Sequence, residues 1–162
     1  MKHILLSFVV IVLSFLSMSC SGKNNLVGKW KMIDSSPEAF FEFTNDGHVI
    51  IMAKGDEPKY GTYATNENQT PYQIDVILNA DDPNPSMRRK AAGIYKIEGN
   101  KLVLKLANRA DAANIHPSDF NAEDRAYMTK EFERFEGTIP TEYTQKKSKV
   151  DIRVETPKQP NP

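Results

Sequence analysis

The segment from Gly93 to Leu106 constrains the fold more than any other part of the sequence. Gly99-Asn100 stands at its centre, and both residue types tolerate the positive φ angles of a two-residue hairpin turn. With these two residues as the loop, the cross-strand pairs are Glu98 with Lys101, Ile97 with Leu102, Tyr95 with Leu104 and Gly93 with Leu106. One face of this hairpin is apolar, whereas the other carries its charges. Register, alternation and charge pairing agree, so the segment predicts a β-hairpin whose apolar face belongs to a core.

Further strand patterns follow one another at short spacing. They are rich in aromatic and β-branched residues, and they cover residues 28–34, 38–44, 48–53, 59–64 and 72–79. The turn Asn45-Asp46-Gly47 allows two registers. A two-residue turn would pair Phe43 with Ile50, and a three-residue loop ending on Gly47 would pair Phe43 with Val49. We favour the three-residue loop.

The last expected strand, residues 128–135, has a competing interpretation. Asn121 followed by Glu123 and Asp124 could begin a helix, since Asn is a good N-cap and acids suit the first turn. We favour the strand because it would close a barrel. The fold class we predict is all-β, an up-and-down antiparallel β-barrel of about eight strands. The interior of such a barrel is either filled by side chains or holds one small ligand.

The N-terminus predicts export. Residues 1–19 comprise a short basic start, an apolar run and a small-residue zone, as in a secretory signal peptide. Cys20 follows directly and is the only cysteine, so an intrachain disulfide is excluded. Its position resembles the lipobox of bacterial lipoproteins, which implies an acylated Cys20 that anchors the chain to a membrane of the cell envelope. Cleavage after Ser19 by an ordinary signal peptidase, and hence secretion, is the alternative.

The chain divides into four regions by composition. Residues 1–19 are the expected signal peptide, 20–25 a polar tether, 26–136 the barrel domain and 137–162 a flexible tail. The tail contains four prolines and few apolar residues, too few to offset the cost of ordering it.

Charge and motifs exclude several classes of function. Removing residues 1–19 leaves 20 basic and 21 acidic side chains, and nucleic-acid binding needs a clustered basic field. The run Arg88-Arg89-Lys90 is expected to be a solvated loop edge. The sequence has no nucleophile elbow and no phosphate-binding glycine loop, so we expect no enzyme and no cofactor. His48 and His116 are expected on the surface, and we predict no metal site.

The order of motifs resembles that of lipocalin-like proteins, and in particular a bacterial family of exported lipocalin-like domains of unknown function. The shared motifs are Gly28-x-Trp30, Phe41-x-Phe43, Asp46-Gly47, Pro71-x-x-Ile74-Asp75, Gly93-Ile94-Tyr95 and Pro117-x-x-Phe120. The resemblance implies that Trp30 plugs one end of the barrel and that Arg134 packs over its ring.

The resulting hypothesis is an envelope-anchored, lipocalin-like lipoprotein that binds a small apolar or amphipathic ligand. Under the predicted register, the residues that would line the interior are Phe41, Phe43, Ile74, Tyr95 and Leu104. The alternative is a filled barrel that serves as a structural or interaction module for another envelope component.

Overall fold

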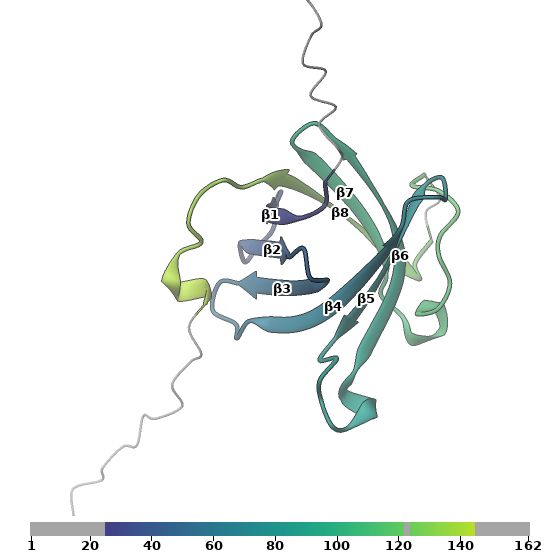
Figure 1. Cartoon of the computed structure of the whole chain (residues 1–162), viewed down its shortest axis with the longest axis horizontal. Helices are drawn as coiled ribbons and strands as arrows, with labels where there is room; N and C mark the ends of the chain where they lie inside the picture. Colours follow the sequence, from purple (N-terminus) through teal and green to yellow (C-terminus); the bar gives the residue numbers. More distant parts are fainter. Residues whose placement is uncertain (1–24, 122–123, 145–162) are drawn as a thin grey trace, which may run out of the picture.

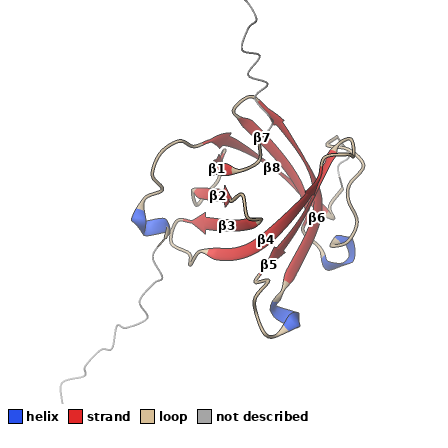
Figure 2. Ribbon diagram, in the orientation of Figure 1, coloured by secondary structure: helices blue, strands red, loops and turns tan. Residues whose placement is uncertain are grey.

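The structure is a computed structural model that describes residues 25–121 and 124–144. Eight antiparallel strands form a closed up-and-down barrel in which every strand pairs with its neighbours in sequence and β8 pairs with β1 (Figure 1). The strands are β1 (Gly28–Met32), β2 (Ala39–Phe43), β3 (His48–Ala53), β4 (Lys59–Asn66), β5 (Tyr72–Leu78), β6 (Arg89–Glu98), β7 (Lys101–Ala107) and β8 (Tyr127–Arg134). Helical structure in the described residues is limited to three short 3₁₀ turns (Figure 2): η2 (Pro85–Met87), η3 (Ala110–Ala112) and η4 (Thr141–Tyr143). The predicted fold class is confirmed.

Both predicted hairpin registers are confirmed. In the β6–β7 hairpin Tyr95 faces Leu104 and Glu98 faces Lys101. Gly99 alone of the two turn residues has a positive φ, 63°, which suits the first central position of a type II′ turn. In the β2–β3 hairpin Phe43 faces Val49, and Gly47 adopts a φ of 83° at the end of the three-residue loop.

The last strand is also confirmed, since residues 127–134 form β8 rather than a helix. Phe132 supplies the reason, because it is 1% exposed and packs among the interior side chains of the barrel. A helix over these residues would leave β1 and β7 with unpaired edges.

The interior core comes from inward-facing residues of all eight strands. Its fully buried members include Trp30, Phe43, Ile74, Tyr95 and Leu104. The chain thus brings together the residues whose alternation predicted a common face.

The domain does not end at residue 136 as expected. Ile139 and Tyr143 are buried against Phe40 and Met52, which lie on the outer face of β2 and β3. Figure 1 shows η4 beside β3, on the outside of the barrel. The expected tail is therefore packed as far as residue 144, and its remainder, residues 145–162, lies outside the described residues.

A polar contact fixes this C-terminal segment. The Tyr143 hydroxyl donates a hydrogen bond to the Glu38 carboxylate, which also pairs with Lys31 at 2.6 Å. The hydrogen bond to Glu38, together with burial of the ring, raises the pKa of Tyr143 to about 12. Lys31 and then Tyr143, both bonded to the carboxylate, lower the pKa of Glu38.

A second segment, residues 108–121, covers the outer face of β6 and β7. The Ala92 amide donates to the Ala113 carbonyl at 3.0 Å, and Lys105 Nζ donates to the Asp119 carbonyl at 2.9 Å. Ile94 and Lys105 are consequently only 1% and 2% exposed although both point away from the interior. At β6 and β7, therefore, side chains are buried on both faces of the sheet.

Candidate functional site

The two ends of the barrel differ in how they are closed. At the end where β1 begins and β8 finishes, residues 25–27 run beneath Trp30, whose indole Nε1 donates to the Leu26 carbonyl at 2.8 Å. The Arg134 guanidinium lies over the indole ring, 4.2 Å from its centroid. Its Nη1 and Nη2 donate to the carbonyls of Val27 and Asn25 at 3.2 and 2.7 Å. The contact implied by the resemblance is therefore present, and we call this the closed end.

Tyr95 belongs to the closed end as well. Its hydroxyl donates to Glu67 Oε1 at 2.9 Å in the connection between β4 and β5, and its ring packs 5.6 Å from that of Tyr72. Burial of the ring, followed by the hydrogen bond to Glu67, raises the pKa of Tyr95 above its ordinary value. This tyrosine is therefore a neutral, fixed part of the barrel floor.

The opposite end, which we call the mouth, is framed by the longer connections, residues 33–38, 54–58, 79–88 and 108–126. The inner wall is less covered there. Inward-facing apolar side chains near the mouth are half-buried or exposed, namely Met32, Ile51, Leu78, Leu106 and Met128. Since these residues face inward, solvent reaches the inner side of the wall at this end.

The start of β8 forms part of this opening. β8 pairs with β7 from Tyr127 onward, but its pairing with β1 begins only at Phe132. Met128, which faces inward opposite Leu106, is 47% exposed. One wall of the mouth is therefore a strand that has a ladder partner on one side only.

The five residues predicted to line a ligand site are not equivalent. Phe43, Ile74, Tyr95 and Leu104 are each at most 1% exposed, within the packed part of the interior. Phe41 alone of the five is half-buried. Alternation does not identify the residues at the mouth, because it assigns a side chain to a face and says nothing of its depth in the barrel. Counting along each strand from the Trp30 plug would have supplied that depth.

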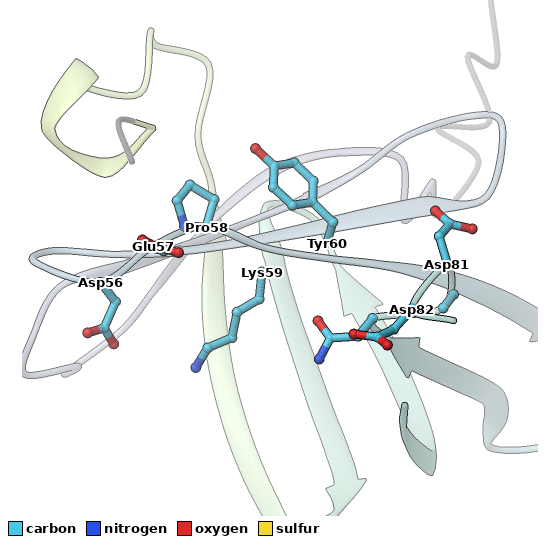
Figure 3. Close-up of a pocket in the computed structure, with 9 residues that line it drawn as sticks. Asp56, Glu57, Pro58, Lys59, Tyr60, Asp81 and Asp82 are labelled. Carbon is cyan, nitrogen blue, oxygen red and sulfur yellow. The ribbon is translucent and has the colours of Figure 1, made fainter. Parts of the chain in front are cut away.

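A hollow of about 540 Å³ lies at the rim of the mouth (Figure 3). It is bordered by the β3–β4 connection, the start of β4 and the loop after β5, and its acidic members are Asp56, Glu57, Asp81 and Asp82. Lys59 and Tyr60 point to opposite sides of β4, with Lys59 on the inward-facing register opposite Ile51 (Figure 3). Within the described residues no three His, Cys, Asp or Glu side chains converge as metal ligands would.

A smaller hollow of about 140 Å³ lies on the outer wall beside Asp75 and His116. Asp75 Oδ1 is buried and accepts no hydrogen bond from the described residues, while His116 Nε2 and Lys90 Nζ stand 3.6 and 3.7 Å away. This space suits a bridging water with three polar neighbours. His116 is thus partly covered, whereas His48 is exposed beside Asp46.

The basic run also differs from expectation. Arg88 bonds the Asp82 carbonyl through Nε and Nη2, but Arg89 and Lys90 are the first residues of β6 rather than a loop edge. Arg89 faces inward opposite Leu78.

No protein-family model matches this chain, and no curated protein sequence matches it significantly. In the described part of the chain, no helix has the length and apolar character needed to cross a membrane.

Proposed function

We propose that this protein is a lipocalin-like lipoprotein of the bacterial cell envelope that binds a small apolar or amphipathic molecule through the mouth of its barrel. The observation that carries the proposal is that the burial of inward-facing apolar side chains decreases along the inner wall from the closed end to the mouth. Aromatic and aliphatic side chains are packed beneath the mouth, and half-buried or exposed apolar side chains surround it. Burying such surface is worth about 25 cal/mol per Å², so a ligand with a hydrocarbon part gains free energy by covering it.

Ligand capture is tested most directly by native mass spectrometry of the purified chain, combined with displacement of an environment-sensitive fluorescent amphiphile. We expect Met128→Asp to weaken binding of the amphiphile by roughly tenfold, because a charge replaces apolar contact area at the mouth. Thr129→Asp, which changes the neighbouring exposed side chain on the outer face of β8, is the matched control. Equal affinities for both variants, or no binding at all by the unmodified chain, contradict the proposal.

Anchoring at Cys20 rests on the sequence, since residues 1–24 lie outside the described residues. Acyl chains contribute about 0.8 kcal/mol per buried CH₂, and two or more chains on one residue hold a soluble domain at a bilayer. We expect the Cys20→Ala protein to lose incorporated palmitate label and to move from the membrane fraction to the soluble fraction. Persistence of Cys20→Ala in the membrane fraction, resistant to high salt, contradicts lipid anchoring through this residue.

A second candidate function is an interaction module for another envelope component. Among the described residues, the exposed large hydrophobic side chains are Tyr60, Met87, Ile115 and Met128, and all four lie in the mouth-proximal strands or loops. Apolar side chains gathered at one end also suit a protein partner. A protein partner that docks on these side chains should be crosslinked from position 87 and not from the control position Thr129. A protein that captures only small ligands should give no crosslinked partner from either position.

A further inference from the structure

The first part of β8 presents an open backbone edge. The Arg134 amide donates to the Asn100 carbonyl, so the register puts the even-numbered residues of β8 in hydrogen-bonded pairs with β7. The N–H and C=O of Thr129 therefore point away from β7. On that side the last bond from the β1 chain joins the Ile33 amide to the Glu131 carbonyl. Within the described part of the chain, no hydrogen bond reaches either backbone group of Thr129.

The side chains at this edge favour an occupant from the same chain. Met128 faces inward there and is 47% exposed, so a strand laid along the edge would cover apolar surface. Lys130 also faces inward, and an inward-pointing charge opposes indiscriminate pairing between molecules. A segment of the same chain has the advantage of a high effective concentration at such an edge.

A segment with a suitable pattern follows the last described residue. Residues 149–155, Lys-Val-Asp-Ile-Arg-Val-Glu, alternate strictly between charged and β-branched apolar residues. Alternation with period two is typical of a strand with one buried face, and β-branched residues favour strands. The stretches on either side, residues 145–148 and 156–162, contain no apolar residue other than proline. The pattern is thus confined to one strand-length segment.

The described end of the chain lies near the point where β1 and β8 part. The Tyr143 hydroxyl donates to the Glu38 carboxylate, which also pairs with Lys31 on β1. Lys31 lies directly opposite Glu133 of β8, one pair before the ladder between the two strands ends. The C-terminal segment therefore leaves the described structure close to the open edge.

The connecting chain is long enough to reach this edge. Thr129 is four residues from Glu133 along β8, a distance of roughly 14 Å. The five Cα–Cα steps from Thr144 to Lys149 span at most roughly 18 Å. A strand that enters beside the end of β1 and follows the open edge runs toward the start of β8. It is therefore antiparallel to β8 and in line with β1.

We infer that residues 149–155 add to the open edge of β8 as an antiparallel ninth strand and complete this side of the mouth. The backbone of the added strand supplies partners for the N–H and C=O of Thr129. Its three apolar side chains face inward and cover Met128, while its charged side chains stay in solvent on the side of Thr129. This inference goes beyond the proposed function and does not depend on a ligand.

Hydrogen exchange of the Thr129 amide, followed by nuclear magnetic resonance, tests the inference. We expect exchange in the full purified chain to be about tenfold or more slower than in a chain that ends at Thr144, because a ladder amide exchanges only when the ladder opens. The Lys130 amide, which the register directs toward β7, is the internal reference and should be equally protected in both chains.

Ile152→Asn in the full chain removes an apolar side chain from the face that turns inward, and it is expected to speed exchange of the Thr129 amide by about tenfold. Asp151→Asn places the same side chain on the opposite face and is the matched control, with exchange unchanged. Circular dichroism checks that each variant is folded.

Equal exchange of the Thr129 amide in the full and shortened chains overturns the inference. Equal exchange rates in Ile152→Asn and Asp151→Asn do the same, because the face of the segment would then be irrelevant. Protection that rises with protein concentration would mean that the segment pairs with a second copy, and it too overturns an intrachain strand.

Discussion

Replacing Trp30 by alanine is expected to lower the free energy of unfolding by about 3–5 kcal/mol. The indole is fully buried, its Nε1 donates a hydrogen bond to the Leu26 carbonyl, and the Arg134 guanidinium lies over the face of the ring. The substitution therefore removes apolar contact, leaves a cavity and removes the aromatic ring that the Arg134 guanidinium contacts. A loss of this size is a large fraction of the stability of an ordinary domain.

Urea denaturation followed by far-ultraviolet circular dichroism measures the Trp30 effect, since Trp30 is the only tryptophan and fluorescence is lost with it. Tyr60→Ala, at a residue 60% exposed, is the control and should change stability by about 0.5 kcal/mol or less. Arg134→Met keeps most of the side-chain length but loses the cation, and it should cost about 0.5–2 kcal/mol from the ring contact alone. A Trp30→Ala protein as stable as the control contradicts the role of the indole as a plug.

Gly93→Ala is expected to destabilise the barrel by about 1–3 kcal/mol, as overpacking does. A Cβ at this position would lie 2.3 Å from the Lys105 carbonyl oxygen and 2.5 Å from Leu106 Cδ2. The carbonyl oxygen belongs to the backbone of β7, so relief requires the two strands to move apart. Glycine thus permits a close approach of β6 to β7 at this position.

Gly61→Ala offers an independent repeat of the Gly93 experiment. Its Cβ would meet the Ile77 carbonyl oxygen at 2.4 Å, again on the backbone of the next strand. Thermal unfolding should show lowered midpoints for both alanine variants and an unchanged midpoint for Thr129→Ala, which alters an exposed side chain of β8. Unchanged midpoints for both glycine variants would mean that the strands do not approach this closely.

The sequence predicts the strands of the barrel better than the two segments, residues 108–121 and 137–144, that pack against their outer faces. Turn chemistry predicts both hairpin registers: Gly99 suits a two-residue loop, and Gly47 suits the end of a three-residue loop, the favoured one of the two registers that this turn allows. Alternation then assigned Tyr95 and Leu104 to the interior. These are local properties of short segments, so they survive in a sequence considered alone.

The two outer segments depend on contacts between distant segments, and composition alone misjudged them. Residues 137–144 carry few apolar side chains, yet Ile139 and Tyr143 find Phe40 and Met52 on the outside of β2 and β3. The signal was present in β3, whose residues Val49 to Met52 are apolar on both faces. A strand apolar on both faces predicts a second layer outside the barrel.

Alternation alone does not give the depth of a side chain in the barrel, which requires counting along each strand from the Trp30 plug. The candidate ligand residues were chosen by face, and the structure places most of them in the packed interior near the plug. The mouth residues Leu78 and Met128 share that face, and Met128 is exposed on the part of β8 that precedes its pairing with β1.

The closed end also sets how the molecule would stand on a bilayer. Asn25 is bonded to Arg134 at that end, and it lies only five Cα–Cα steps along the chain from Cys20. Five such steps span at most roughly 18 Å, so if Cys20 is acylated as proposed, the lipid would hold the tryptophan-plugged end near the headgroups. Under that proposal the mouth, at the other end of the barrel, would face the aqueous compartment and not the bilayer.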